Sequence, residues 1–402
     1  MTCATLSPPF IPDEIIAQIL CLLPVKTILQ LRCVSKAWKT LISDPSFVQK
    51  HFNYSSLNPY LLFTPRKLRY LTSIVKFFHV LRFLETDSLI TVSNDSFYGG
   101  MDNCQVVGTC NGLICLFFHY GHQIYWFCLW NPATRILSEK LGIFQDHGTI
   151  YDSGKFTFGC DISTETYKVV ALSKVEVREE NTLSVRSQFR VFGLNDNCWR
   201  NFLFCSSIPV CLIYDNTEMI NNGLHLNGTV NWLALPKYIK PFYRYDCKQF
   251  VIVSPDLSTE TCTQFLLPPG FDEVPFFQPT HSVLMDCLCF SHDLKGSEFV
   301  LWQMKEFGIQ KSWTLLFKIN FFDIQMHNRL SQIGTSLLPL YLSKNGDTCI
   351  LAGYEDDQIV IYIQREKRVK RIGVAIATEF SWFSPMEYLS PMEYVESLVS
   401  TC

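Results

Sequence analysis

The sequence predicts an α+β multidomain chain in which an N-terminal domain of three short helices precedes a large all-β, β-propeller-like domain. Three observations support this. The 402-residue length exceeds what one hydrophobic core usually covers. The first fifty residues place apolar side chains at helical spacing between prolines. After His51 the chain changes to short strand-like runs separated by turn signals, in a sequence that is 14% aromatic.

Composition limits the classes of partner. With 48% hydrophobic and 18% charged residues, the chain is too apolar to be disordered. A net charge of −3 argues against binding to nucleic acid or to an anionic membrane, and it favours a protein as the partner. The seventeen cysteines are odd in number and the start lacks a basic and apolar leader, so we expect reduced, buried thiols. The sequons at Asn53, Asn94 and Asn227 therefore receive no role.

The longest uncharged stretch is Leu113–Trp130 (LICLFFHYGHQIYWFCLW). The polar HYGHQ divides it into two short apolar runs, which predicts a β-hairpin rather than a membrane span.

The first helix is predicted in Ile11–Pro24, where Pro12, Asp13 and Glu14 suit the first turn. Pro24 separates it from a second helix in VKTILQLRCVS, and a third, KAWKTLISD, ends before Pro45.

The apolar residues of the first helix cover more than half of its circumference. A domain of this size buries too little surface alone, so a helical partner is implied. The alternative is a helical cap that folds onto the following domain.

The segment P-D-E-I-I-A-Q-I-L-C-L-L-P-V-K-T-I-L-Q-L-R-C-V-S-K-A-W, followed by L-I-S-D-P-S-F, resembles the plant F-box from Phe10 to about His51. The resemblance implies docking to the Skp-type adaptor of a cullin-based ubiquitin ligase, with Trp38 internal. By position, the residues it implies as adaptor contacts are Pro12, Ile15, Ile16, Leu20, Leu23, Pro24, Leu29 and Val34.

Hairpin signals recur in the β-domain at nearly equal intervals. Asn-Gly pairs stand at Asn111, Asn227 and Asn345, and the sequence D-[IL]-S-T-E-T starts at Asp161 and again at Asp256. Trp199 and Trp313 follow in the same order. This cycle without helices favours a propeller of six or seven blades, with a pair of β-sandwiches as the alternative.

The β-domain also resembles the plant F-box-associated, kelch-like (type-one) interaction domain. The matching segments appear in order as GTCNGLICL, LWNPATR, FGCD, NGTVNWL, SPDLSTE and WQMKEFGIQKSW. Regular kelch blades are not supported, because Gly99-Gly100 is the only Gly-Gly pair. Ser254-Pro-Asp stands where that family commonly has an aromatic residue before Asp.

We therefore divide the chain into an F-box at 8–52, a connection with the first strands at 53–100, a propeller-like domain at 101–380 and a loosely ordered tail at 381–402. The tail contains a duplication, Ser384-Pro-Met-Glu-Tyr-Leu followed by Ser390-Pro-Met-Glu-Tyr-Val.

No catalytic residue, metal or cofactor is predicted. Cys287-x-Cys289-x-x-His292 lacks a partner ligand pair and is more simply interpreted as strand packing, and His119-x-x-His122 as a solvated turn. The basic run Arg365–Arg371 is interpreted as a turn, with a nuclear localisation signal or a grip on an acidic target as alternatives.

The resemblance implies a substrate-recognition adaptor, not an enzyme, in the cytoplasm, the nucleus or both. Its partners would be the Skp-type adaptor, the cullin and RING subunits reached through it, and an unknown target protein. The alternatives from other classes are a propeller enzyme and a carbohydrate-binding module.

Overall fold

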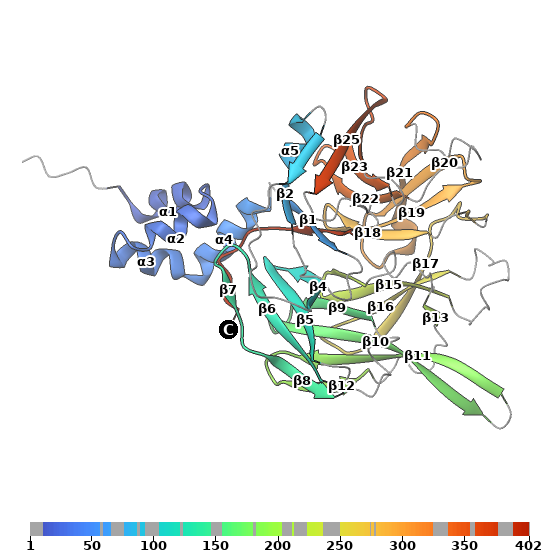
Figure 1. The fold of residues 1–402 in the computed structure, drawn as a ribbon, viewed down its shortest axis with the longest axis horizontal. Helices are drawn as coiled ribbons and strands as arrows, with labels where there is room; N and C mark the ends of the chain where they lie inside the picture. The colour runs from blue at the N-terminus through green and yellow to red at the C-terminus, as the bar shows by residue number, and fades with distance from the viewer. Residues whose placement is uncertain are drawn as a thin grey trace, which may run out of the picture.

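The computed structural model describes residues 11–56, 59–65, 76–86, 89–92, 104–120, 124–145, 155–179, 182–202, 211–212, 223–235, 250–273, 275–276, 279–324, 337–353, 358–376 and 389–401. Two parts are visible in Figure 1: a group of helices at one side and a large ring of strands.

The N-terminal domain holds one helix more than the sequence predicts. Its helices are α1 (Asp13–Cys21), α2 (Val25–Leu31), α3 (Lys36–Ser43) and α4 (Pro45–Ser55). The additional helix begins at Pro45, the residue expected only to end the third, because proline fits the first helical position and Asp44 caps the helix. The Asp44 carboxylate accepts hydrogen bonds from the N–H groups of Ser46 at 2.8 Å and Phe47 at 3.3 Å.

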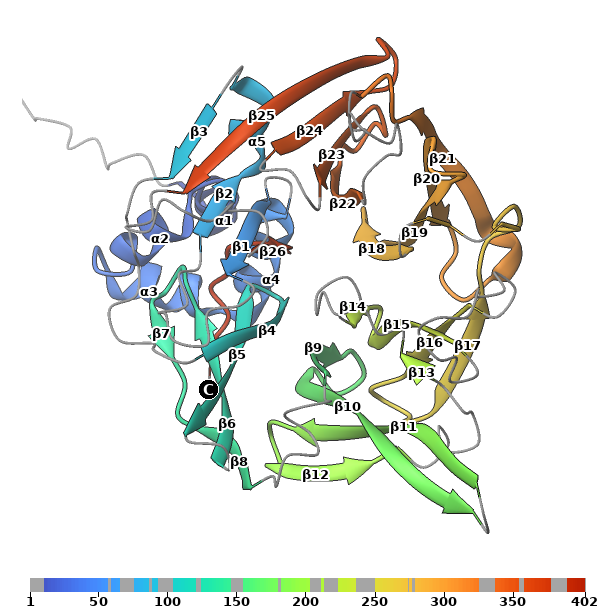
Figure 2. The same cartoon turned by 45° about the vertical axis from the view of Figure 1, so that its right-hand side comes forward.

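The strands that the structure describes form six sheets, the blades of a β-propeller (Figure 2), in agreement with the lower of the two predicted blade numbers. Blade 1 contains β1 (Tyr60–Pro65), β2 (Lys76–His79) and β26 (Leu389–Tyr394). Blade 2 contains β4 (Cys104–Cys110), β5 (Leu113–Tyr120), β6 (Ile124–Asn131), β7 (Ile136–Leu137) and β8 (Leu141–Gln145). Blade 3 contains β9 (Lys155–Asp161), β10 (Thr166–Glu179), β11 (Thr182–Gly193) and β12 (Cys198–Asn201).

The remaining blades continue around the ring. Blade 4 contains β13 (Cys211–Leu212), β14 (Leu224–Leu226), β15 (Thr229–Leu235), β16 (Val251–Pro255) and β17 (Cys262–Leu266). Blade 5 contains β18 (Thr280–Leu284), β19 (Cys287–Leu294), β20 (Glu298–Met304) and β21 (Trp313–Asn320), with a short 3₁₀ helix at Gln310–Ser312. Blade 6 contains β22 (Leu337–Leu342), β23 (Thr348–Gly353), β24 (Gln358–Ile363), β25 (Arg368–Ile376) and β3 (Leu89–Val92), while α5 (Val80–Glu85) follows β2.

Two pairings between early and late segments close the ring. β26 pairs antiparallel with β1, placing Tyr394 opposite Tyr60, and β3 pairs parallel with β25 at the outer edge of blade 6. The expected loosely ordered tail is therefore wrong for residues 389–401. Their first six residues, which contain most of the second copy of the duplication, are the innermost strand of blade 1; the first copy lies almost entirely outside the described residues.

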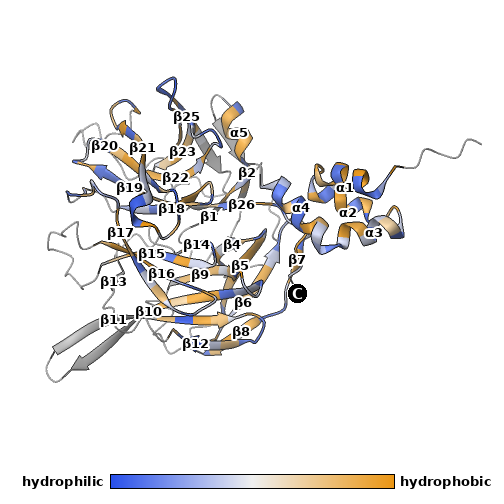
Figure 3. Cartoon of the chain, turned by 180° about the vertical axis from the view of Figure 1, so that it is seen from behind, coloured by the Kyte–Doolittle hydropathy of each residue, from blue (hydrophilic) through white to orange (hydrophobic). Residues whose placement is uncertain are grey.

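Apolar side chains are packed between neighbouring blades, in six clusters that correspond to the six interfaces. Strand β5 shows why the sequence looks continuously hydrophobic: Leu113, Cys115 and Phe117 pack towards blade 3, whereas Ile114 and Leu116 pack towards blade 1. A strand buried on both faces needs no alternation of apolar and polar residues. The predicted hairpin is confirmed as β5–β6, and the strands are predominantly hydrophobic in Figure 3.

The three predicted Asn-Gly turns all follow an innermost strand, in blades 2, 4 and 6. Their intervals of 116 and 118 residues, from 111 to 227 and from 227 to 345, each correspond to two blades. The D-[IL]-S-T-E-T turns are not equivalent, contrary to the predicted repeat: Asp161 is the last residue of the innermost strand β9, whereas Asp256 follows β16, the third strand of its blade.

Candidate functional site

The helical domain exposes several large apolar side chains although it has a core of its own. Leu20, Cys21, Ile28, Ile42 and Phe47 form that core. On the outside, Leu22 is 69% exposed, Val34 63% and Ile19 53%. This surface is the first candidate binding site, because several large apolar side chains gathered on so small a domain are typical of an interface.

The structure separates the residues predicted from the F-box resemblance into three groups. Pro12, Ile15, Pro24 and Val34 are exposed, while Ile16, Leu23 and Leu29 are partly buried. Leu20 is a correction: it is 2% exposed and packs in the core of the helical domain, so it is not a surface residue.

Ile19 and Leu22 were not among the adaptor contacts predicted from position in the F-box resemblance. The apolar residues of α1 cover most of its circumference, so their spacing cannot tell which of them meet α2 and α4 and which meet solvent. The surplus of apolar residues in the sequence predicted an exposed apolar surface, but packing decides which side chains form that surface.

The C-terminal segment joins the helical domain to the ring. Leu398 packs against the helical core, and Val399 packs into the cluster between blades 2 and 3. The buried Asn131 amide donates to the carbonyl oxygens of Ser397 at 3.0 Å and Val399 at 2.8 Å.

Two further features fix this segment. Glu396 is hydrogen-bonded to the backbone of Val25 and to the Tyr60 hydroxyl, and burial raises the pKa of its carboxyl. At Gly112, where φ is +76°, a Cβ would overlap the side chain of Ser397. The residues after β26 therefore hold the helical domain against one face of the propeller.

That face carries the turns that follow the innermost strands, and we call it the helical face. The innermost strands β26, β4, β9, β14, β18 and β22 are neighbours around the ring. The turn after β4 approaches Ser397, and a Cβ at Gly228, after β14, would lie 3.3 Å from Ile162, after β9.

The opposite face, which we call the loop face, carries the turns between second and third strands and the connections between blades. Among the described residues at these positions, four large apolar side chains are exposed: Tyr120, Leu266, Phe276 and Phe322. They follow or end β5, β17 and β21, or precede β18. The long hairpin β10–β11 also extends away from the helices (Figure 1). The loop face is the second candidate binding site.

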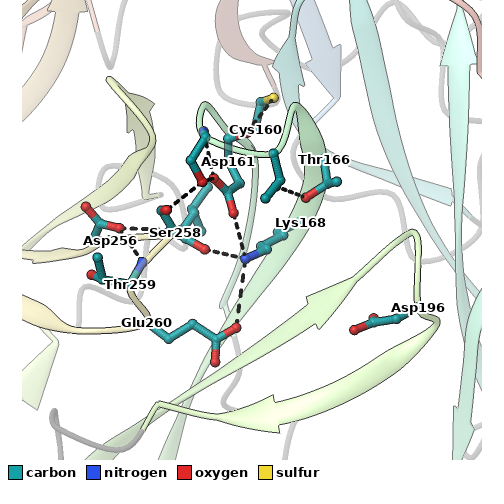
Figure 4. A network of polar contacts seen from close by, with 12 residues as sticks. Cys160, Asp161, Thr166, Lys168, Asp196, Asp256, Ser258, Thr259 and Glu260 are labelled. Atoms are coloured by element: carbon teal, nitrogen blue, oxygen red, sulfur yellow. Dashed lines mark hydrogen bonds and ion pairs between the residues drawn. The ribbon is translucent and has the colours of Figure 1, made fainter.

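A polar network connects blades 3 and 4 on the helical face (Figure 4). The Lys168 ammonium lies 3.1 Å from the Asp161 carboxylate and 3.8 Å from the Glu260 carboxylate, and it also donates to the Leu257 carbonyl. Burial alone would raise the pKa of Asp161, but hydrogen bonds from Ser163, Lys168 and Thr164 outweigh it and lower the pKa to about 2.

The two D-[IL]-S-T-E-T turns meet in this network. Ser163 and Ser258, one from each turn, are hydrogen-bonded to each other at 2.7 Å. Asp161 and Asp256 each bind the backbone of their own turn. The recurring sequence therefore produces a matched contact between blades rather than a chemical site.

The candidate metal residues do not assemble into a ligand set. Among the described residues, no three His, Cys, Asp or Glu side chains are grouped so that they could hold a metal ion. Cys289 is buried in the cluster between blades 5 and 6, and the His292 imidazole packs edge-on against Phe271. His119 is described and His122 lies outside the described residues. None of the described helices is long and apolar enough to cross a membrane.

The basic run Arg365–Arg371 starts in the predicted turn, between β24 and β25. Its later residues contribute to the fold: Lys370 donates to the Leu84 carbonyl and Arg371 to the Ile324 carbonyl, each at 3.1 Å. Arg365 is largely exposed and lies 3.8 Å from Asp347.

Comparison with known proteins matches both parts of the chain. The F-box domain family matches residues 10–50, and the family described as F-box associated beta propeller domain matches residues 65–401. An F-box/kelch-repeat protein of Arabidopsis thaliana is 29% identical over 334 residues, which cover 78% of this chain and 80% of that protein. F-box protein CPR1 of the same plant is 26% identical over 319 residues, covering 77% and 73%.

Proposed function

We propose a function from one premise: the chain belongs to the F-box proteins that carry an F-box associated beta propeller domain. This combination of domains supports the role of a substrate receptor in a ubiquitin ligase of the Skp–cullin–F-box type. In this proposal, the F-box binds the Skp-type adaptor and the propeller binds the target protein.

The exposed apolar surface of the F-box is the observation that carries this proposal. Ile15, Ile19, Leu22 and Val34 all remain at the surface of a domain whose core is already filled. Covering one such side chain contributes about 1.5–3 kcal/mol, which is roughly a tenfold to hundredfold change in affinity. The adaptor would supply the apolar cover that the propeller does not provide.

The positions of the two faces also favour this function. The F-box is held against the helical face, and the exposed aromatic side chains of the described blades include Tyr120 and Phe276 on the loop face. A target bound there would leave the F-box free for the adaptor. The cullin and RING subunits would join through the adaptor, and rate would come from the raised effective concentration of target near a ubiquitin-charged enzyme.

Paired substitution of exposed F-box residues tests adaptor binding. Ile19→Asp with Leu22→Asp should abolish co-purification with a Skp-type adaptor while leaving the melting temperature nearly unchanged, because both side chains are outside the core. Ile309→Asp is the matched control: Ile309 is 51% exposed but lies on the propeller. Undiminished adaptor recovery by the double variant would contradict the proposal.

A second experiment tests the loop face. Proximity labelling with the Ile19→Asp/Leu22→Asp variant, which should not bind the adaptor, would identify target proteins that bind the propeller and are not released. Tyr120→Asp and Phe276→Asp should then reduce recovery of such a target, whereas Ile162→Asp, an exposed residue on the helical face, should not. Equal losses from both faces would contradict the assignment.

We further propose that the chain performs no catalysis itself and acts in the cytoplasm, the nucleus or both. Target turnover in cells should require the F-box surface. If the purified chain alone modified a target or a glycan, an enzymatic function would replace this proposal.

A further inference from the structure

The strand that closes the ring belongs to a repeated sequence. Ser384-Pro-Met-Glu-Tyr-Leu is followed directly by Ser390-Pro-Met-Glu-Tyr-Val, and the second copy supplies most of β26. This strand pairs antiparallel with β1, so that Tyr394 lies opposite Tyr60. Residues 384–388 lie outside the described residues, and it is their sequence that repeats β26.

A displacement of β26 by six residues would give β1 the same partners again. Six is an even number, so each side chain would remain on its own face of the sheet. Tyr388 would replace Tyr394 opposite Tyr60, and the glutamate, methionine and proline before it would likewise replace their copies. Because a proline would again lie opposite Phe63, the ladder would lack the same N–H donor in both registers.

The contacts of β26 itself do not distinguish the two copies. Met392 and Tyr394 pack in the cluster between blades 1 and 2, and the Tyr394 ring lies 5.1 Å from that of Phe77. The Thr109 hydroxyl donates to the backbone carbonyl of Glu393 at 2.7 Å, a bond that does not depend on the glutamate side chain. A Met-Glu-Tyr sequence from either copy would supply the same contacts.

The residues that follow β26 do distinguish the two registers. Ser397 is fully buried against Gly112, and its hydroxyl accepts a hydrogen bond from the Val399 N–H at 3.0 Å. After the displacement, Pro391 would replace Ser397 at a place where even a Cβ on Gly112 has no room. Glu393 would replace Val399 and bring a carboxylate into the apolar cluster between blades 2 and 3. The contacts after β26 therefore favour the described register.

We propose that β26 has two registers. In the described register, the residues after β26 hold the F-box against the propeller. In the other, displaced by six residues, the first copy of the repeat closes the ring and the F-box is released from the helical face.

The displaced register keeps the ring closed while it removes the seat of the F-box. At about 3.3 Å per residue, six residues correspond to a movement of about 20 Å along β1. Leu398, which packs against the helical core, would move away from that contact. The F-box would keep its covalent connection from α4 to β1 but lose the support of the C-terminal segment.

The chain before β26 contributes the residues that the displacement requires. Residues 377–388 connect β25 to β26, and in the displaced register residues 377–382 would remain as the connection. Six residues can extend over about 20 Å. Because Ile372 of β25 and Leu61 of β1 pack in the same cluster, this shortened connection would join adjacent blades.

Engineered cysteine pairs in the full-length chain report each register. Thr64 lies opposite Ser390, and Cα atoms of such cross-strand pairs are about 4.5–5.5 Å apart, within the range of a disulfide. Thr64→Cys with Ser390→Cys should crosslink in the described register, and Thr64→Cys with Ser384→Cys in the displaced one. Thr64→Cys with Glu387→Cys is the matched control, because residue 387 lies opposite Thr64 in neither register.

Peptide mass spectrometry without reductant identifies the crosslinks. Tryptic peptides 51–66 and 372–402 contain the two engineered positions, and Cys402→Ser leaves one cysteine in each peptide. In the otherwise unchanged chain, the crosslink to residue 390 should be the stronger one.

Weakening the seat should shift the balance between the two crosslinks. Leu398→Asp removes an apolar contact with the F-box, so the crosslink to residue 384 should increase at least about tenfold relative to that to residue 390. Adding Met386→Asp and Tyr388→Asp should abolish this increase, because the first copy then no longer fits the apolar cluster beside β1.

A detached strand would give a different result from a displaced one. If Leu398→Asp leaves the crosslink to residue 384 no stronger than that to residue 387, the proposal is overturned. Should thermal melting show that Leu398→Asp does not fold, Asn131→Ala takes its place, since it removes two hydrogen bonds to the same segment and the same comparison then decides.

Discussion

Substitution of Lys168 by methionine tests the polar network between blades 3 and 4. Lys168 is 8% exposed and Asp161 2% exposed, so removal of the ammonium leaves a buried carboxylate with only its turn contacts. Removing one partner of a buried ion pair typically lowers the free energy of unfolding by about 3–5 kcal/mol. We expect Lys168→Met to lower the free energy of unfolding by this amount at pH 7.

The pKa of Asp161 gives an independent magnitude and a sign. It lies at about 2 in the folded chain against an ordinary value of 3.8, and a unit of pKa corresponds to about 1.4 kcal/mol. The carboxylate therefore contributes about 2.5 kcal/mol, which is present above pH 4 and lost as the pH falls towards 2. In Lys168→Met the pKa of Asp161 should rise, so the deficit should shrink in acid.

Urea unfolding followed by tryptophan fluorescence at pH 7 and pH 3.5 measures both effects. Lys295→Met is the control, because Lys295 pairs with Glu273 at the surface with a side chain that is 67% exposed. It should cost less than about 1 kcal/mol. A Lys168→Met deficit below about 1 kcal/mol, or one that stays the same in acid, would refute the reasoning.

The remaining predictions concern the C-terminal segment. Gly112→Ala should lower stability more than Gly346→Ala. Both glycines have positive φ, but a Cβ at Gly112 would overlap Ser397, whereas a Cβ at Gly346 meets no atom within 4 Å. Equal melting temperatures of the two variants would contradict the close contact between Gly112 and Ser397. Asn131→Ala should cost about 1–3 kcal/mol and open the C-terminus to carboxypeptidase, since two buried carbonyls lose their donor. Glu396→Gln should stabilise the chain more at pH 8 than at pH 4, because burial raises the pKa of this carboxyl and its ionisation opposes folding as the pH rises. A pH-independent effect would show that Glu396 is not desolvated.

Local patterns predicted several elements correctly. Prolines placed the boundaries of the first helices, and the Asn-Gly pairs placed three turns. In each case the signal is short-range: proline lacks an N–H, and Asn-Gly accepts positive φ. Asp44 and Pro45 carried an equally local signal for α4, but the proline was interpreted only as a stop.

Which apolar residue faces which neighbour depended on packing. Leu20 and Leu22 are two positions apart at the C-terminal end of α1, yet Leu20 is in the core and Leu22 is on the surface. The D-[IL]-S-T-E-T turns have almost the same sequence but different places in their blades, because a turn with an aspartate at its start fits any sharp reversal between strands.

By itself, then, the sequence determined the N-terminal helices, the alternation of short strands and turns, and the surplus of apolar residues in the helical domain. Each of these depends on neighbours within a few positions along the chain. Tertiary structure decided that the chain's last residues complete the first blade and hold the F-box against the propeller. These contacts join residues more than 300 positions apart, and closure of the ring brings them together.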